Sequence, residues 1–93
     1  MEGGVEFEWD DDNVRHLKRH RVSVQEFEEL INGEPLYLEY QAAGDEERHK
    51  VLGVSKAGRV LVAIWTPRGG RVRAVTAYGA GRTYRKLYWE TVG

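Results

Sequence analysis

The main change in the period of the hydrophobic pattern falls at residues 33–35, and this change limits the fold more than any other feature. Before it, Phe27, Leu30 and Ile31 recur at the spacing of a helix. After it, apolar residues recur at the two-residue spacing of strands. The run 60–65 is apolar on both faces, which is typical of a central, covered strand. The order is a short strand, two helices, a run of strands and a last helix, and this segregation of helices and strands predicts an α+β fold.

The ends of the first two helices are predicted from their capping residues. The run 10–13 supplies an N-cap and an acidic first turn for a helix that ends near His20. Ser23 and Glu26 fit the capping box of a second helix, which ends at residues 32–33. The other expected elements are strands over 5–9, 36–41, 48–55, 59–66 and 71–78, a polar loop over 42–47, and a helix over about 82–90.

The length of 93 residues predicts a single domain over 1–93, with residues 1–4 disordered. We expect the four later strands to form an antiparallel meander. Two N-terminal helices and one C-terminal helix would pack on it. Tyr84, Leu87 and Tyr88 are expected on one face of the last helix.

Acidic and basic residues are separated along the chain, although the formal net charge is only −1. Residues 1–47 hold 14 acids and 4 bases (net −10), whereas residues 48–93 hold 10 bases and one acid (net +9). This split indicates that the basic half contacts a polyanion, unless the two halves pair with each other within one domain.

Several classes of protein are excluded by what the sequence lacks. There is no cysteine, hence no disulfide scaffold, thiolate metal site or cysteine nucleophile. His16 and His20 have a spacing that can bind zinc, but a third ligand is not evident, so we expect no metal and no cofactor. No apolar run approaches the roughly 18 residues of a membrane span. No secretory signal opens the chain, so we expect a cytoplasmic location without membrane contact.

Cationic side chains begin two strands that run in the same direction in a meander. Arg48 and Lys50 begin one, and Arg71 and Arg73 begin the other, so the four are expected at one end of the sheet. Acids are nearly absent from this half of the chain, which favours a phosphate-binding patch over a merely solvated one. The last helix extends the basic set with Arg82, Arg85 and Lys86.

Two side chains near this patch suit proton transfer. His20 flanks the apolar stripe of the first helix, where it either packs, caps the helix or carries protons. Tyr78 ends a strand just before glycines and is therefore available to a site. Cation-rich chemistry without a metal suits RNA cleavage, because the substrate supplies its own nucleophile, the 2′-hydroxyl.

Short motifs over residues 6–88 resemble the BrnT toxins, ribonuclease toxins of type II toxin–antitoxin systems. They are Phe7-Glu8-Trp9-Asp10, Arg19-His20 with Val22-Ser23, Glu47-Arg48 with Leu52-Gly53 and Arg59, and Val72-Arg73 with Ala77 and Tyr88. The resemblance implies a RelE-like fold, metal-independent RNA cleavage, and neutralisation by a BrnA-like antitoxin of the ribbon-helix-helix type. That antitoxin binds DNA, so the toxin would meet DNA only through it.

With this resemblance, the sequence has four catalytic candidates. Arg48 and Arg73 would hold the scissile phosphate, and His20 or Tyr78 would transfer protons. The further RNA-binding candidates are Arg19, Lys50, Arg71, Arg82, Arg85 and Lys86. The chain departs from the family at Arg21, where glycine is usual, and at His49, where tryptophan is usual. It also departs at Tyr78-Gly79, where arginines are usual, and at Tyr84, where glutamate is usual.

These departures leave two alternatives open. The first is a toxin-like module that binds RNA or an antitoxin without cleavage. The second is a structural module whose charged halves pair only with each other.

Overall fold

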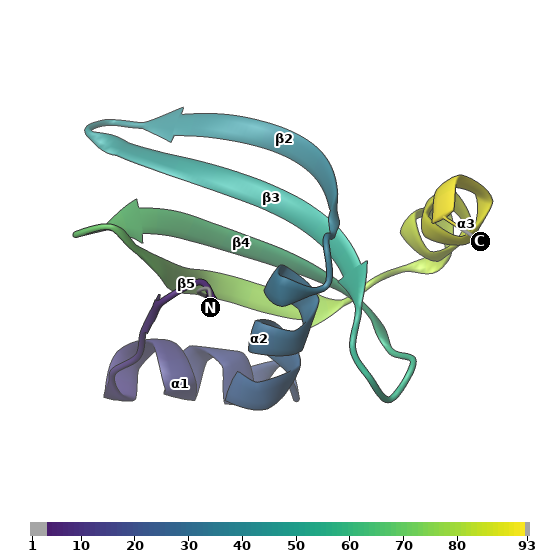
Figure 1. Cartoon of the computed structure of the whole chain (residues 1–93), viewed down its shortest axis with the longest axis horizontal. Coiled ribbons are helices and arrows are strands. Elements are labelled where there is room, and N and C mark those ends of the chain that lie inside the picture. Colours follow the sequence, from purple (N-terminus) through teal and green to yellow (C-terminus); the bar gives the residue numbers. More distant parts are fainter. Residues whose placement is uncertain (1–3, 93) are drawn as a thin grey trace.

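The computed structural model describes residues 4–92, apart from the side chain of Ala43, so the predicted disorder of residues 1–3 lies outside the described residues. Its elements are β1 (Phe7–Glu8), α1 (Asp11–Arg19), α2 (Val24–Asn32), β2 (Leu36–Ala43), β3 (Glu46–Val54), β4 (Val60–Arg68), β5 (Arg71–Gly79) and α3 (Arg82–Val92). The strands form one sheet in the order β1-β5-β4-β3-β2 (Figure 1). The predicted α+β meander is confirmed.

The strand register brings the beginnings of β3 and β5 to the same end of the sheet. Both strands pair antiparallel to β4, so they run in the same direction. Trp65 of β4 lies opposite His49 on one side and Ala74 on the other. The next β4 residue, Thr66, lies opposite Arg73.

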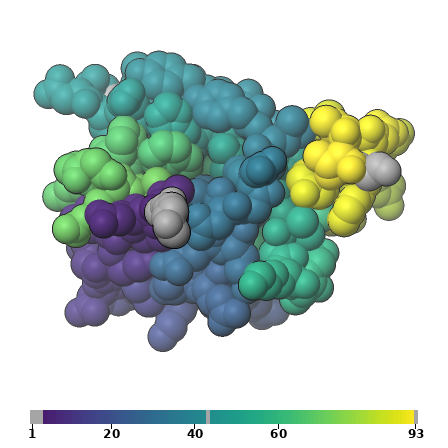
Figure 2. Space-filling model, viewed as in Figure 1, coloured from purple at the N-terminus to yellow at the C-terminus, as the bar shows by residue number. Residues whose placement is uncertain are grey.

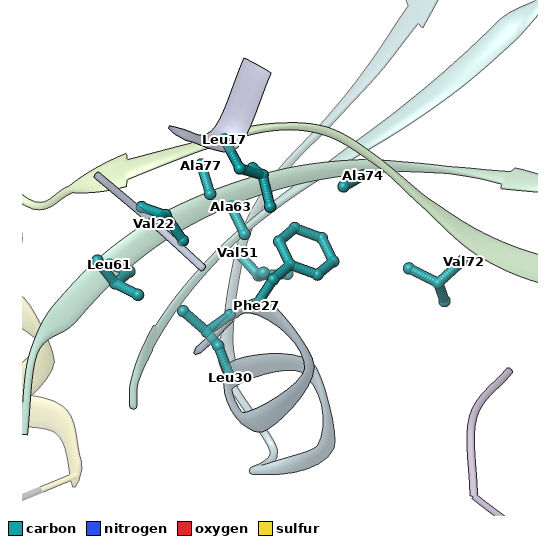
Figure 3. Packing of buried hydrophobic residues seen from close by; sticks show 10 residues of the cluster. All are labelled: Leu17, Val22, Phe27, Leu30, Val51, Leu61, Ala63, Val72, Ala74 and Ala77. Carbon is teal, nitrogen blue, oxygen red and sulfur yellow. The ribbon is translucent and has the colours of Figure 1, made fainter. Parts of the chain in front are cut away.

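One face of the sheet is covered by α1 and α2. Phe27 and Leu30 project from α2 toward the strands, where Val51 and Ala63 lie (Figure 3). Leu17 of α1 is fully buried in the same cluster. Burial of these apolar side chains is the main force that holds both helices on this face.

The other face is only partly covered, because α3 packs at one end of the sheet. Tyr88 is buried there with Leu52 and Val62. Leu87 is 39 % exposed, so of the three residues expected on one face of the last helix it is not packed on the sheet. The helix protrudes from the molecule (yellow in Figure 2), and two of its aromatic rings, Tyr84 and Tyr88, pack on the sheet.

Both predicted helix starts are confirmed, whereas the predicted loop over 42–47 is wrong. Asp10 and Asn13 form a reciprocal capping box, as do Ser23 and Glu26. Residues 42–43 and 46–47 extend the paired strands β2 and β3, which leaves a two-residue turn with Gly44 at φ +65°. A hairpin ladder satisfies more backbone groups than an open loop, and this outweighs the polarity of these residues.

Candidate functional site

Arg48 and Arg73 project from the partly covered face of the sheet and line one pocket of about 240 Å³ with residues of α1. Thr66 of β4 lies between their strands, and His16 of α1 closes one side. Strand alternation places both arginines on this face, because Val51, Val72 and Ala74 point to the other one. The predicted meeting of cations from β3 and β5 therefore holds for these two residues.

The side chain of Arg73 is mostly enclosed and already has carboxylate partners. It is 16 % exposed, and its Nη1 lies 2.7 Å from Asp10 Oδ2 and 3.7 Å from Glu8 Oε1. Neither Nη1 nor Glu8 Oε1 has a well-aligned hydrogen bond, although both atoms are buried. The polar contact with Asp10 raises the pKa of Arg73, and the same contact lowers the pKa of Asp10. Both groups therefore stay charged at neutral pH.

Arg48 is more accessible, and it too has a carboxylate beside it. Its Nε donates a hydrogen bond of 2.6 Å to Glu46 Oε2, and its side chain is 39 % exposed. Glu46 also lines the pocket. The expectation that acids are nearly absent beside these cations is therefore wrong. The acidic and basic halves of the chain do pair here, and an incoming phosphate would compete with carboxylates for both guanidinium groups.

The pocket continues into a wider hollow of about 600 Å³ toward the β4–β5 hairpin. The two share Glu46, Thr66 and Arg73, and Arg68 is added in the wider one. We call the two hollows together the arginine cleft. A separate, more apolar hollow of about 290 Å³ between α1 and α2 has no lining residue in common with the cleft.

Three proton-carrying side chains form a row along the edge of β5. β1 covers this edge only at Val72 and Arg73, and α1 packs along β5. The rings of His16 and His20 are 5.7 Å apart, and the rings of His20 and Tyr78 are 6.1 Å apart. The two predicted proton carriers, His20 and Tyr78, are thus neighbours, and His16 links them to the arginine cleft.

Lys50 lies on the same face but is directed toward α3. Its Nζ is 5.2 Å from the ring centroid of Tyr84. Contact with Tyr84 raises the pKa of Lys50, against the opposing effect of burial. The ammonium group is therefore a fixed positive charge at neutral pH, suited to holding an anion rather than to proton transfer.

The other predicted RNA-binding residues are dispersed. Arg71 is exposed beside Glu6, with Nε 3.9 Å from the carboxylate. Arg19 and Arg82 are exposed at the end of α1 and the start of α3. Arg85 donates a hydrogen bond to the Ala80 carbonyl, and Lys86 lies 4.0 Å from Glu90. These five residues and Lys50 do not form one cluster with the arginine cleft.

His49 lies on the opposite face, as side-chain alternation predicts. Its ring stacks on Trp65 at 4.5 Å, and its Nδ1 is 2.8 Å from the Tyr37 hydroxyl. An imidazole on the face away from the cleft is a useful internal reference for experiments on the cleft.

Two lining residues, His16 and Glu46, were missed by reasoning from the sequence. His16 is one helical turn from His20, so a site at His20 predicts one near His16 as well. Glu46 was assigned to a loop, and only its pairing in β3 brings it beside Arg48.

The fold and the cleft define a class: a small α+β domain in which two arginines from an open sheet face and an imidazole from α1 line one pocket. The chain belongs to the BrnT family. A family model described as "Ribonuclease toxin, BrnT, of type II toxin-antitoxin system" matches residues 9–83. The family is one of ribonucleases that act on RNA and are paired with an antitoxin. No curated protein and no solved structure matched the chain. The implied RelE-like fold therefore stays a prediction.

Within residues 4–92, no helix is both long enough and apolar enough to cross a membrane.

Proposed function

We propose that this chain is a toxin that cleaves RNA without a metal, with Arg48 and Arg73 holding the scissile phosphate. The observation that carries the proposal is the single pocket lined by both guanidinium groups and an imidazole. Guanidinium groups match phosphate oxygens in geometry and charge. They would also stabilise the extra negative charge that develops on phosphorus during cleavage.

The reaction needs two proton transfers in addition to the two arginines. A base takes the proton of the 2′-hydroxyl, and the 2′-oxygen forms a bond to phosphorus. The bond from phosphorus to the 5′-oxygen breaks, and an acid protonates that oxygen. The products are a 2′,3′-cyclic phosphate and a 5′-hydroxyl. His20 and Tyr78, which are neighbours and are linked to the cleft through His16, would handle these protons.

The dispersed cations would hold the rest of the RNA strand. Lys50 and the α3 residues Arg82, Arg85 and Lys86 lie toward the C-terminal end of β5. Arg71 lies at the other end, and Arg19 lies near His20. An RNA strand that crosses the open face would meet these charges on both sides of the cleft.

The partner we propose is a BrnA-like antitoxin of the ribbon-helix-helix type, and the cytoplasm is the proposed location. The whole chain, residues 1–93, would act as one toxin domain. Any contact with DNA would be made by the antitoxin.

One observation favours a second candidate, a module that binds RNA or the antitoxin without cleavage. Arg73 is mostly enclosed between two carboxylates, and Tyr78 packs partly against the second core cluster. Both features are also those of residues with a structural role.

The two candidates are separated by purified protein and a fluorescent RNA oligonucleotide in buffer with a metal chelator. The toxin hypothesis predicts fragments with cyclic phosphate ends, and loss of cleavage by about 10²–10³-fold in Arg48→Ala. Lys56→Ala is the matched control: it removes one positive charge in the turn beyond the far end of β3, roughly 25 Å along the chain from Arg48. Binding that weakens with salt but gives no fragments would favour the binding module.

A further inference from the structure

His16 is the histidine that shares a pocket with the two arginines. It lines the pocket with Arg48 and Arg73, whereas His20 is not among the lining residues of that pocket. We propose that His16 is a catalytic residue that transfers a proton at the scissile phosphate. The inference rests on the proposed ribonuclease function and adds to it a residue that neither the family motifs nor the site candidates include.

The position of His16 follows from the helix geometry. Four residues along a helix make slightly more than one turn and rise about 6 Å, so His16 and His20 share a side of α1. Their ring separation of 5.7 Å agrees with this. Because α1 packs along β5, this side of the helix borders Tyr78 at His20 and the arginine cleft at His16.

The arrangement supplies the two proton transfers from two different groups. His16, beside the phosphate-holding arginines, would take the 2′-hydroxyl proton as the 2′-oxygen bonds to phosphorus. When the bond to the 5′-oxygen breaks, that oxygen would receive a proton from His20 or Tyr78. Histidine suits this chemistry because its charge changes between pH 5 and 8. The titratable and charged groups around His16 are Asp12 of α1, His20 at the C-cap of α1, Glu46 and Arg48 of β3, and Arg73 of β5.

The test uses the full chain with His16→Ala and His16→Gln, and with Lys18→Ala as the matched control. Lys18 is exposed on α1 and lies outside the cleft. We expect the cleavage rate of both His16 variants to fall by about 100-fold or more, with the thermal midpoint unchanged and Lys18→Ala unaffected. Imidazole added to the buffer should restore part of the activity of His16→Ala, but none of that of Arg48→Ala. The acid limb of the wild-type pH–rate profile should be absent in His16→Ala.

The outcomes separate this inference from the function on which it rests. Suppose that the wild type cleaves RNA and that the cleavage rate of His16→Ala or His16→Gln is within about twofold of the wild-type rate. This loss is much smaller than the loss of a proton carrier causes, so the inference fails and the ribonuclease function stands. If the wild type makes no fragments, the ribonuclease function fails and the inference fails with it.

A second readout does not depend on turnover. In an NMR titration with an RNA oligonucleotide that has a 2′-deoxy group at the cleavage site, the His16 ring signals should move. Those of His49, on the opposite face, should not. Binding that leaves the His16 signals unmoved would also overturn the inference.

Discussion

Removing Arg73 and removing Arg48 should have different effects on stability, although both residues line the same pocket. The Arg73 side chain is 16 % exposed, whereas that of Arg48 is 39 % exposed. In Arg73→Ala, the buried Glu8 Oε1 loses its enclosed cation and keeps only the exposed Arg68, whose Nε lies 3.8 Å away. In Arg48→Ala, water can replace the lost partner of Glu46, because the Glu46 side chain is 43 % exposed.

The size of the difference follows from these exposures. Removing a mostly enclosed cation from beside a buried carboxylate oxygen costs about 1–3 kcal/mol, and a solvent-exposed ion pair contributes about 0–1 kcal/mol. For a domain of this length, 1 kcal/mol shifts the thermal midpoint by about 4–8 °C. We therefore expect Arg73→Ala to lower the midpoint by roughly 5–20 °C, and Arg48→Ala by less than about 8 °C.

Thermal unfolding followed by circular dichroism at neutral pH measures both midpoints. A midpoint of Arg73→Ala within about 2 °C of the wild type, or a larger loss in Arg48→Ala, would refute the reasoning. If the prediction holds, a loss of activity in Arg73→Ala would reflect both the lower stability of the fold and the loss of the guanidinium group from the site. Arg48→Ala is then the cleaner probe of the cleft.

Three further variants test the backbone, the core and the charge pair. Arg21 has φ +60°, so Arg21→Gly should relieve about 1–2 kcal/mol of backbone strain. The extra freedom of glycine in the unfolded chain should cost about 0.5–1 kcal/mol of stability. Urea titration should therefore show a small net gain in the free energy of unfolding. A Cβ at Gly53 would lie 2.9 Å from Leu30 Cγ, so Gly53→Ala should lower the free energy of unfolding by about 1–3 kcal/mol; an unchanged urea midpoint would contradict this packing. Asp10→Asn keeps a capping side chain but removes the charge beside Arg73. Because the pKa of Asp10 is lowered in the fold, its carboxylate stabilises the protein above about pH 4, and that stabilisation disappears on acidification. The midpoints of wild type and Asp10→Asn should therefore converge as the pH falls below about 4; a constant gap would contradict the charge pair.

Local features of the chain could be predicted from the sequence. The capping box at Ser23 depends on residues three positions apart and is as expected, and so is an N-cap for the first helix within the run 10–13. Arg21 has a left-handed backbone, which agrees with the glycine that is usual in the family at this position. The central position of β4 followed from an apolar run on both faces, which only a covered strand tolerates.

Features that depend on distant pairing could not be predicted. The parallel pairing of β1 with β5 places Glu8 opposite Arg73, 65 positions apart in the chain, and no local signal indicates it. Glu46 meets Arg48 only because β2 and β3 continue to a two-residue turn. The place of His16 in the cleft depends on how α1 packs along β5, which neither its spacing to His20 nor its charge determines.

The most direct test of the central claim is induced expression in a bacterial host, with growth and total RNA followed together. Wild type, Arg48→Ala and Lys56→Ala would be compared at equal levels of soluble, folded protein. We expect the wild type and Lys56→Ala to arrest growth and produce new RNA fragments, and Arg48→Ala to do neither. Normal growth with intact RNA in the wild type, or arrest that persists in Arg48→Ala, would contradict a ribonuclease that acts through the arginine cleft.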